Sequence, residues 1–259
     1  MKNKFKLNSS TLLVFILTTG VFGIINTEMG VIGILPLIAE NFQVTVPEAG
    51  WTVSIFALVV AISAPITPLL FSGINRKKVM ILALGLFTLS NIISMMTTNF
   101  TVLLISRALP AFLHPVYVSM AFTVAAASVS KEKAPKAVAK VFIGVSAGMV
   151  LGVPVTSYIA SEVSYSMGML FFTVVNALVL VATILFVPSM PVKEKLSYGT
   201  QLSVLKKKVV WYSILAITLI NGALFGFFSY MSDYLKTITG VSYTVISTML
   251  LIYGLANII

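Results

Sequence analysis

Residues 11–39 read TLLVFILTTGVFGIINTEMGVIGILPLIA, a run of apolar residues interrupted mainly by Asn26, Thr27 and Glu28. A helix that crosses the hydrocarbon core of a bilayer needs about 20 predominantly apolar residues, so this run is long enough to span a membrane. A removable signal peptide would close a shorter apolar core with a small-residue cleavage site, and no such site follows here. The stretch therefore predicts a retained first transmembrane helix.

The rest of the chain has the same apolar character. Hydrophobic residues make up 58% of the 259 residues and charged residues only 9%, whereas a soluble domain carries about 25% charged residues. A segment that crosses lipid must satisfy its own backbone hydrogen bonds, so these runs predict an all-α membrane protein surrounded by the lipid bilayer. The eight candidate spans cover about residues 11–39, 50–71, 78–97, 101–126, 137–160, 167–188, 209–235 and 243–259.

The basic residues predict the orientation of these spans. All Lys and Arg residues except Arg107 and Lys236 fall in the N-terminal tail or around the connections after the second, fourth and sixth spans. Alternating spans place these segments on one side of the membrane, and Lys-rich loops face the cytoplasm. We therefore expect a multi-pass protein of a bacterial-type cell membrane with a cytoplasmic N-terminus. The net charge is +10, but the sequence contains no basic patch interleaved with aromatic residues. Nucleic acid is therefore not an expected partner.

The longest polar connection predicts a division of the chain. Residues 189–208 follow six spans, and a basic loop at this place can join two six-helix halves. Residues 1–188 are then an N-terminal half, 189–208 a cytoplasmic linker, and 209–259 the first two spans of an incomplete second half. The eighth run is still apolar where the chain stops, so we expect a chain truncated after about the eighth span.

Two charged residues lie at membrane depth and are candidates for proton coupling. A charge inside the bilayer costs about 2.5–3.5 kcal/mol on insertion scales, so Glu28 and Arg107 should face the bundle interior or a water-filled cavity. Both lie in the outer half of their spans, and one mechanism pairs them in one state until protonation of Glu28 or substrate binding breaks the pair. The alternatives are a static ion pair, a carboxylate satisfied by a neighbouring helix, or an arginine that reaches the interface.

Three further polar residues within the spans are candidates to line a substrate cavity. His114, which Pro115 follows, can titrate near neutral pH, although a hydrogen-bonded structural histidine is the favoured interpretation. Asn221 and Tyr230 lie on the seventh span, where a polar side chain can bind substrate or hold helices together. With no cysteine, one histidine and scattered carboxylates, the sequence predicts neither a metal site nor a cofactor.

A glycine stripe marks the fifth span. Gly144, Gly148 and Gly152 follow one another at every fourth residue, and Pro154 comes next. This spacing puts the glycines on one helical face, where another backbone can approach closely. Pro154 removes a backbone donor and can kink the helix.

These features together resemble the major facilitator superfamily, and within it the twelve-span drug:proton antiporter branch that includes bacterial drug, sugar and purine-nucleoside efflux proteins. Residues 26–39 are similar to the signature TE-x-x-x-x-G-x-LP-x-IA of that branch, with Gly33 and Leu35-Pro36 in register. The stretch from Gly144 to Pro154 resembles its fifth-helix antiporter motif. Residues 106–109 resemble the fourth-helix motif whose arginine is implicated in proton coupling.

The sequence departs from the family pattern in the cytoplasmic loop after the second span. The family supplies an aspartate before the basic residues of this loop motif, whereas Asn75 precedes Arg76 and Lys77 here. This difference puts the usual gating ion pair in doubt. Pro115 also stands where the fourth-helix motif prefers glycine.

The resemblance implies a major facilitator-type helical bundle and a secondary active transporter. The expected activity is proton-coupled efflux of a small molecule by alternating access, with protons and that substrate as partners. A uniporter of the same fold and a non-transporting membrane protein, such as a receptor, a scaffold or a degenerate truncated paralogue, are the alternatives. An enzyme is not expected, because the spans lack a nucleophile–base pair.

Overall fold

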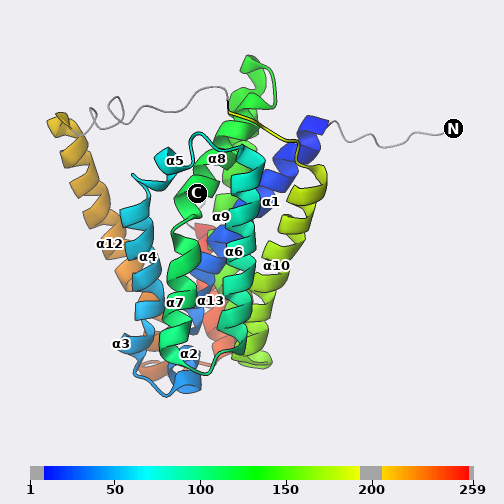
Figure 1. Ribbon diagram of the computed structural model, residues 1–259. Helices are drawn as coiled ribbons and strands as arrows, with labels where there is room; N and C mark the ends of the chain where they lie inside the picture. The colour runs from blue at the N-terminus through cyan, green and yellow to red at the C-terminus, as the bar shows by residue number, and fades with distance from the viewer. Residues whose placement is uncertain (1–8, 193–205, 257–259) are drawn as a thin grey trace.

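The computed structural model describes residues 9–192 and 206–256, which form helices and their connections with no strand among them (Figure 1). The predicted basic tail, most of the predicted linker 189–208 and the end of the eighth predicted span lie outside these residues. The helices are α1 (Ser9–Met29), η1 (Gly30–Ile34), α2 (Leu35–Phe42), α3 (Val46–Ala49), α4 (Trp51–Ser63), α5 (Thr67–Leu70), α6 (Arg76–Met96), α7 (Phe100–Ala111), α8 (His114–Ala127), η2 (Lys131–Lys133), α9 (Ala134–Glu162), α10 (Tyr165–Phe186), α12 (Lys208–Thr237) and α13 (Tyr243–Ala256).

The described residues include seven helical segments long and apolar enough to cross a membrane, which confirms the predicted all-α membrane bundle. The eighth predicted span corresponds to α13, whose apolar part Tyr243–Tyr253 is shorter than a spanning helix. The seven segments are Ser10–Phe42, Val46–Ser63, Arg76–Met96, Phe100–Ala127, Lys131–Glu162, Tyr165–Phe186 and Lys208–Thr237.

Prolines interrupt two spans that the sequence predicted as continuous helices. The second span was expected to reach residue 71, but α4 ends at Ser63, just before Pro65. The fourth span divides into α7, which ends at Ala111, and α8, which begins at His114. A proline ring clashes with the carbonyl four residues earlier, and for Pro115 that residue is Ala111. The helix therefore stops where Pro115 requires it.

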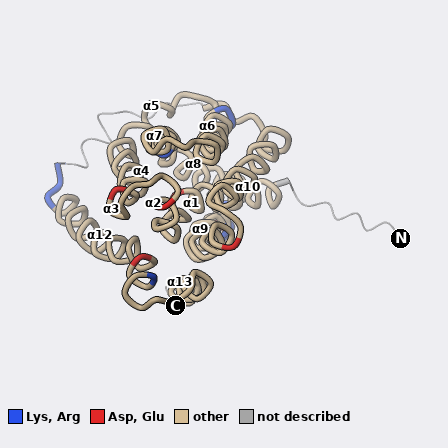
Figure 2. Tube along the Cα trace, turned by 90° about the horizontal axis from the view of Figure 1, so that it is seen from below, with Lys and Arg blue, Asp and Glu red and all other residues tan. Residues whose placement is uncertain are grey.

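The helix α1 runs through the middle of the bundle and belongs to its most buried span (Figure 1). The long helix α9 packs along α1, while α10 packs on α6 and α4 packs on α7. The helix α13 lies against α9, and α12 stands at the edge of the bundle (Figures 1 and 2).

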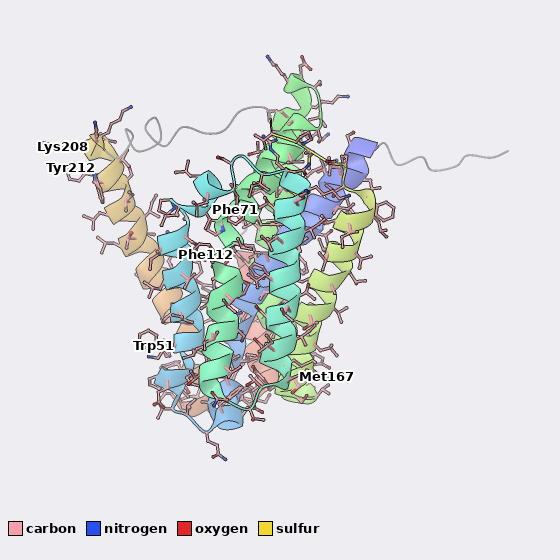
Figure 3. All side chains as sticks on the ribbon, viewed as in Figure 1. Trp51, Phe71, Phe112, Met167, Lys208 and Tyr212 are labelled. Atoms are coloured by element: carbon pink, nitrogen blue, oxygen red, sulfur yellow. The ribbon has the colours of Figure 1, made fainter. Side chains whose placement is uncertain are left out.

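Most basic residues of the described chain lie at one end of the bundle, although Lys236 stands in the last turn of α12, at the other end. The helices α6 and α12 begin at one end with Arg76 and Lys208, and Figure 3 shows Lys208 there and Trp51 at the opposite end. That opposite end, viewed directly in Figure 2, carries α2 and α3, which contain Glu40 and Glu48. The basic segments of the described chain therefore share one end, as a positive-inside arrangement requires.

The glycine stripe of α9 faces α1. A Cβ atom added to Gly144 would collide with the backbone carbonyl of Thr18, and one added to Gly148 would lie 2.8 Å from the Cβ of Ile25. A Cβ on Gly152 would lie 2.6 Å from the side-chain oxygen of Asn26. The absence of side chains on this face of α9 therefore sets how closely the two central helices approach.

We predict that Gly144→Ala destabilises the bundle by about 1–3 kcal/mol, the range for overpacking a tight contact, because the neighbouring group is backbone and cannot rotate away. The measurement is the midpoint of thermal unfolding in detergent. Gly85→Ala on α6 is the matched control, because nothing lies within 4 Å of a Cβ atom there. An equal effect of the two substitutions would contradict the close α1–α9 contact.

Candidate polar site at the break in the first span

The place where α1 ends leaves backbone groups that need partners. The last four carbonyls of an α-helix have no intrahelical donor, and α1 gives way at Gly30 to the 3₁₀-helix η1. Arg107 supplies donors at this point. Its Nη1 donates to the carbonyl of Thr27 at 2.7 Å, and its Nη2 donates to the carbonyl of Glu28 at 3.1 Å.

Arg107 is positioned by the start of its own helix. The side chain of Asn99 caps α7 by accepting the N–H of Val102 at 3.1 Å, which fixes the first turn. The guanidinium lies 4.9 Å from the ring centre of Phe56 on α4, and its Nε donates to the carbonyl of Thr52 at 3.3 Å. Only 2% of Arg107 is exposed, so these contacts with α1 and α4 replace the water that the cation loses.

The carboxylate of Glu28 contacts a histidine. The Oε2 atom of Glu28 lies 3.1 Å from the Nε2 atom of His114, and the two side chains are only 17% and 12% exposed. His114 is the first residue of α8, directly after the interruption that Pro115 causes. Figure 3 shows Phe112, within this interruption, about midway along the bundle. The break thus brings the imidazole to the carboxylate inside the spanning region.

The contact between Glu28 and His114 was not anticipated from the sequence, which instead paired Glu28 with Arg107. The structure brings Arg107 to Glu28, but to its main-chain carbonyl. The signal that could have indicated the histidine was Pro115, because a proline inside a span predicts a break and so a redirected side chain. Protonation of Glu28 or of His114 changes the charge of this pair.

A buried polar network lies on the other side of Thr27. Its hydroxyl accepts from the side-chain amides of Asn91 at 3.2 Å and Asn176 at 2.9 Å, and donates to the carbonyl of Gly23 at 2.9 Å. The Asn176 amide also donates to the carbonyl of Gly23 at 3.3 Å, so this side chain joins α10 to α1.

A cavity of about 440 Å³ opens beside Met29, the last residue of α1. This volume lies in the range of small-molecule sites. Asn221 lines it, whereas Tyr230 and His114 do not. The Tyr230 hydroxyl lies instead against Gly50, at the start of α4. The lining residues come from α1, α9, α12 and α13: Met29, Phe142, Val145, Ser146, Met149, Val150, Asn221, Leu224, Phe225, Phe228 and Tyr253.

The loop motif of Asn75, Arg76 and Lys77 caps α6 and contacts the chain that leaves α10. The Asn75 side-chain oxygen accepts the N–H of Lys77 at 3.0 Å, which makes Asn75 the N-cap. Its amide donates to the Ser189 hydroxyl at 2.7 Å, and the Arg76 N–H donates to the Met190 carbonyl at 3.1 Å. Lys77 Nζ donates to the carbonyl of Ile184 at 2.8 Å. An asparagine thus performs the capping that an aspartate can also perform.

Two bacterial relatives are similar to nearly the whole chain. The inner membrane transport protein YdhP of Escherichia coli (strain K12) is 30% identical over 238 residues, which are 92% of this chain and 61% of the relative. The MFS-type transporter YtbD of Bacillus subtilis is 31% identical over 246 residues, 93% of this chain and 61% of the relative. The chain therefore spans about 61% of the length of these relatives.

Solved structures share the fold at low sequence identity. A bacterial homolog of the human lysosomal transporter Spinster, in an inward-facing and unoccupied conformation, superposes with a TM-score of 0.74 at 16% identity, covering 96% of this chain and 59% of that one. The human organic anion transporter MFSD10 superposes with a TM-score of 0.67 at 16% identity, covering 95% of this chain and 70% of that one. The sequence model of the Major Facilitator Superfamily matches residues 12–259 of this chain. This multi-pass membrane chain belongs to the Major Facilitator Superfamily.

Proposed function

We propose that this chain is part of a proton-coupled secondary transporter that exports a small molecule by alternating access, as in the drug:proton antiporter branch. The observation that carries this proposal is the 3.1 Å contact between the Glu28 carboxylate and the His114 imidazole within the spanning region. Two largely buried groups that can both bind protons form a site for a transported proton. Arg107 holds the backbone of Glu28 in place.

The cavity beside Met29 is the proposed place for substrate. Its walls are mainly apolar and aromatic, with Phe228 stacked on Tyr253 at 4.9 Å between ring centres. Asn221 and Ser146 add polar groups that can orient a ligand. Met29 follows Glu28 directly, so a change in the proton site can alter the wall of the cavity through one short segment of α1. This proximity is the proposed route of coupling.

The proposed organisation follows the family. Residues 1–188 form one six-helix half, 189–208 a cytoplasmic linker, and 209–259 the first part of the second half. Alternating access then requires the two halves to move relative to one another around the cavity. The relatives are named as transport proteins, which supports transport over a receptor or scaffold role.

The test of proton coupling is proton release from the purified protein in weakly buffered detergent, followed with a pH indicator. The probes are a pentose, a purine nucleoside and the amphipathic cation ethidium. We expect at least one probe to displace protons, and we expect Glu28→Gln to abolish this release because the site loses its carboxylate. Glu162→Gln, at the end of α9, is the matched control and should retain it.

Two outcomes would contradict this proposal. Undiminished release from Glu28→Gln would remove Glu28 from the proton site. No release with any of the three probes would count against proton coupling and in favour of uniport or a role without transport.

The proposed cytoplasmic N-terminus makes a separate prediction. The chain contains no cysteine, so single cysteines report their own accessibility. In intact cells, a membrane-impermeant maleimide should label Thr98→Cys, in the exposed connection between α6 and α7, and should not label Ser130→Cys, in the exposed connection before η2. The reverse labelling pattern would show that the orientation is inverted.

A further inference from the structure

We infer that Thr27 is a positioning residue for the proton site, acting through the last turn of α1 with Asn91 and Asn176 as its supports. This inference rests on the proposed function of Glu28 and His114. Thr27 touches neither side chain of that pair in the contacts described above. Its hydroxyl and its carbonyl instead connect three helices to the segment that carries Glu28.

The Thr27 hydroxyl uses its full hydrogen-bonding capacity. A hydroxyl has one donor and two acceptor positions, and here it donates to Gly23 while accepting from Asn91 and Asn176. All of these side chains are buried, with Thr27 and Asn176 fully so. In such surroundings each bond is worth more than in water, and a missing partner is costly.

The bond to Gly23 affects the backbone directly. A threonine hydroxyl that donates to the carbonyl four residues earlier often bends a helix, and Gly23 stands four residues before Thr27. This hydrogen bond stands just before the change of helix type, because α1 ends at Met29 and η1 begins at Gly30. The Thr27 hydroxyl thereby restrains the last turn of α1 from the side of α6 and α10.

The carbonyl of Thr27 restrains the same turn from the side of α7, which carries Arg107. It accepts Arg107 Nη1 at 2.7 Å, while the next carbonyl, that of Glu28, accepts Nη2 at 3.1 Å. A turn of chain held by amides on one side and a guanidinium on the other has little freedom to rotate. The direction in which Glu28 leaves the backbone, and so its distance to His114, depends on that restraint.

The surroundings contain few groups that could otherwise respond to pH. The titratable and charged side chains that the described contacts place near this part of α1 are Glu28, Arg107, His114 and Tyr165, together with Tyr117, whose hydroxyl lies against Gly20. The Tyr165 hydroxyl donates to the carbonyl of Ser94 at 3.1 Å, away from Thr27. Thr27, Asn91 and Asn176 do not titrate, so changing them leaves the number of charged groups around the proton site unaltered.

The test uses His114 itself, because it is the only histidine in the chain. Histidine-selective ¹⁵N labelling then gives the resonances of one imidazole, and these are followed against pH in the ligand-free protein in detergent. We expect Thr27→Val, which keeps the shape and removes the hydroxyl, to displace the titration curve of the imidazole. Thr27→Ser, which restores the hydroxyl, should return the curve to that of the parent.

Two variants separate positioning from general loss of packing. Thr173→Val is the matched control on α10 and should leave the curve unchanged, because within the described part of the chain the hydroxyl of Thr173 bonds to Met169 of its own helix alone. Asn91→Ala removes one support without altering α1, and should displace the curve in the same direction as Thr27→Val even if the latter folds poorly.

The inference is overturned if Thr27→Val and Asn91→Ala both keep the parent curve, or if Thr173→Val displaces it equally. A parallel sample of Glu28→Gln identifies the cause of such a failure. If Glu28→Gln alone displaces the curve, the pair stands and the positioning role falls. If Glu28→Gln also has no effect, the proposed proton site fails together with the inference.

Discussion

The guanidinium of Arg107, buried between two helices, is the interaction on which the described site depends. Lipid offers no hydrogen bonds, so a spanning helix can be interrupted only where other protein groups satisfy the freed backbone. Arg107 does this for Thr27 and Glu28, and it also bonds to the carbonyl of Thr52. A cation at this depth is costly, and its cost is offset because one side chain closes the end of α1 and links it to α4.

Two helix breaks lie close together beside Arg107, and they bring two titratable side chains into contact. The first ends α1 at Met29, and the second separates α7 from α8 at Pro115. Each break turns one titratable side chain toward the other, Glu28 from α1 and His114 from α8. The tight approach of α9 to α1 along the glycine stripe adds a rigid wall behind the first break. The cavity beside Met29 lies at the end of α1, next to the first break.

Much of the fold follows from the sequence, because spanning length and apolar composition leave few alternatives in lipid. Six of the seven spanning segments begin and end within six residues of their predicted bounds. The second ends at Ser63 and not at residue 71, because the helix stops before Pro65 inside a run that remains apolar. For the site, the intramembrane charges Glu28 and Arg107 were identifiable by their cost alone. Their partners were not, because helix rotation and the choice between a carboxylate and a backbone carbonyl are set by three-dimensional packing.

Infrared difference spectroscopy of the protein on acidification tests whether Glu28 and His114 form one proton-binding unit. The other carboxylates of the chain also protonate on acidification, so the band of Glu28 is the one present in the parent spectrum and missing from that of Glu28→Gln. We expect such a band, and we expect its pH dependence to change in His114→Gln. The claim is contradicted if the parent and Glu28→Gln spectra show the same carboxyl bands, or if the band of Glu28 keeps its pH dependence in His114→Gln.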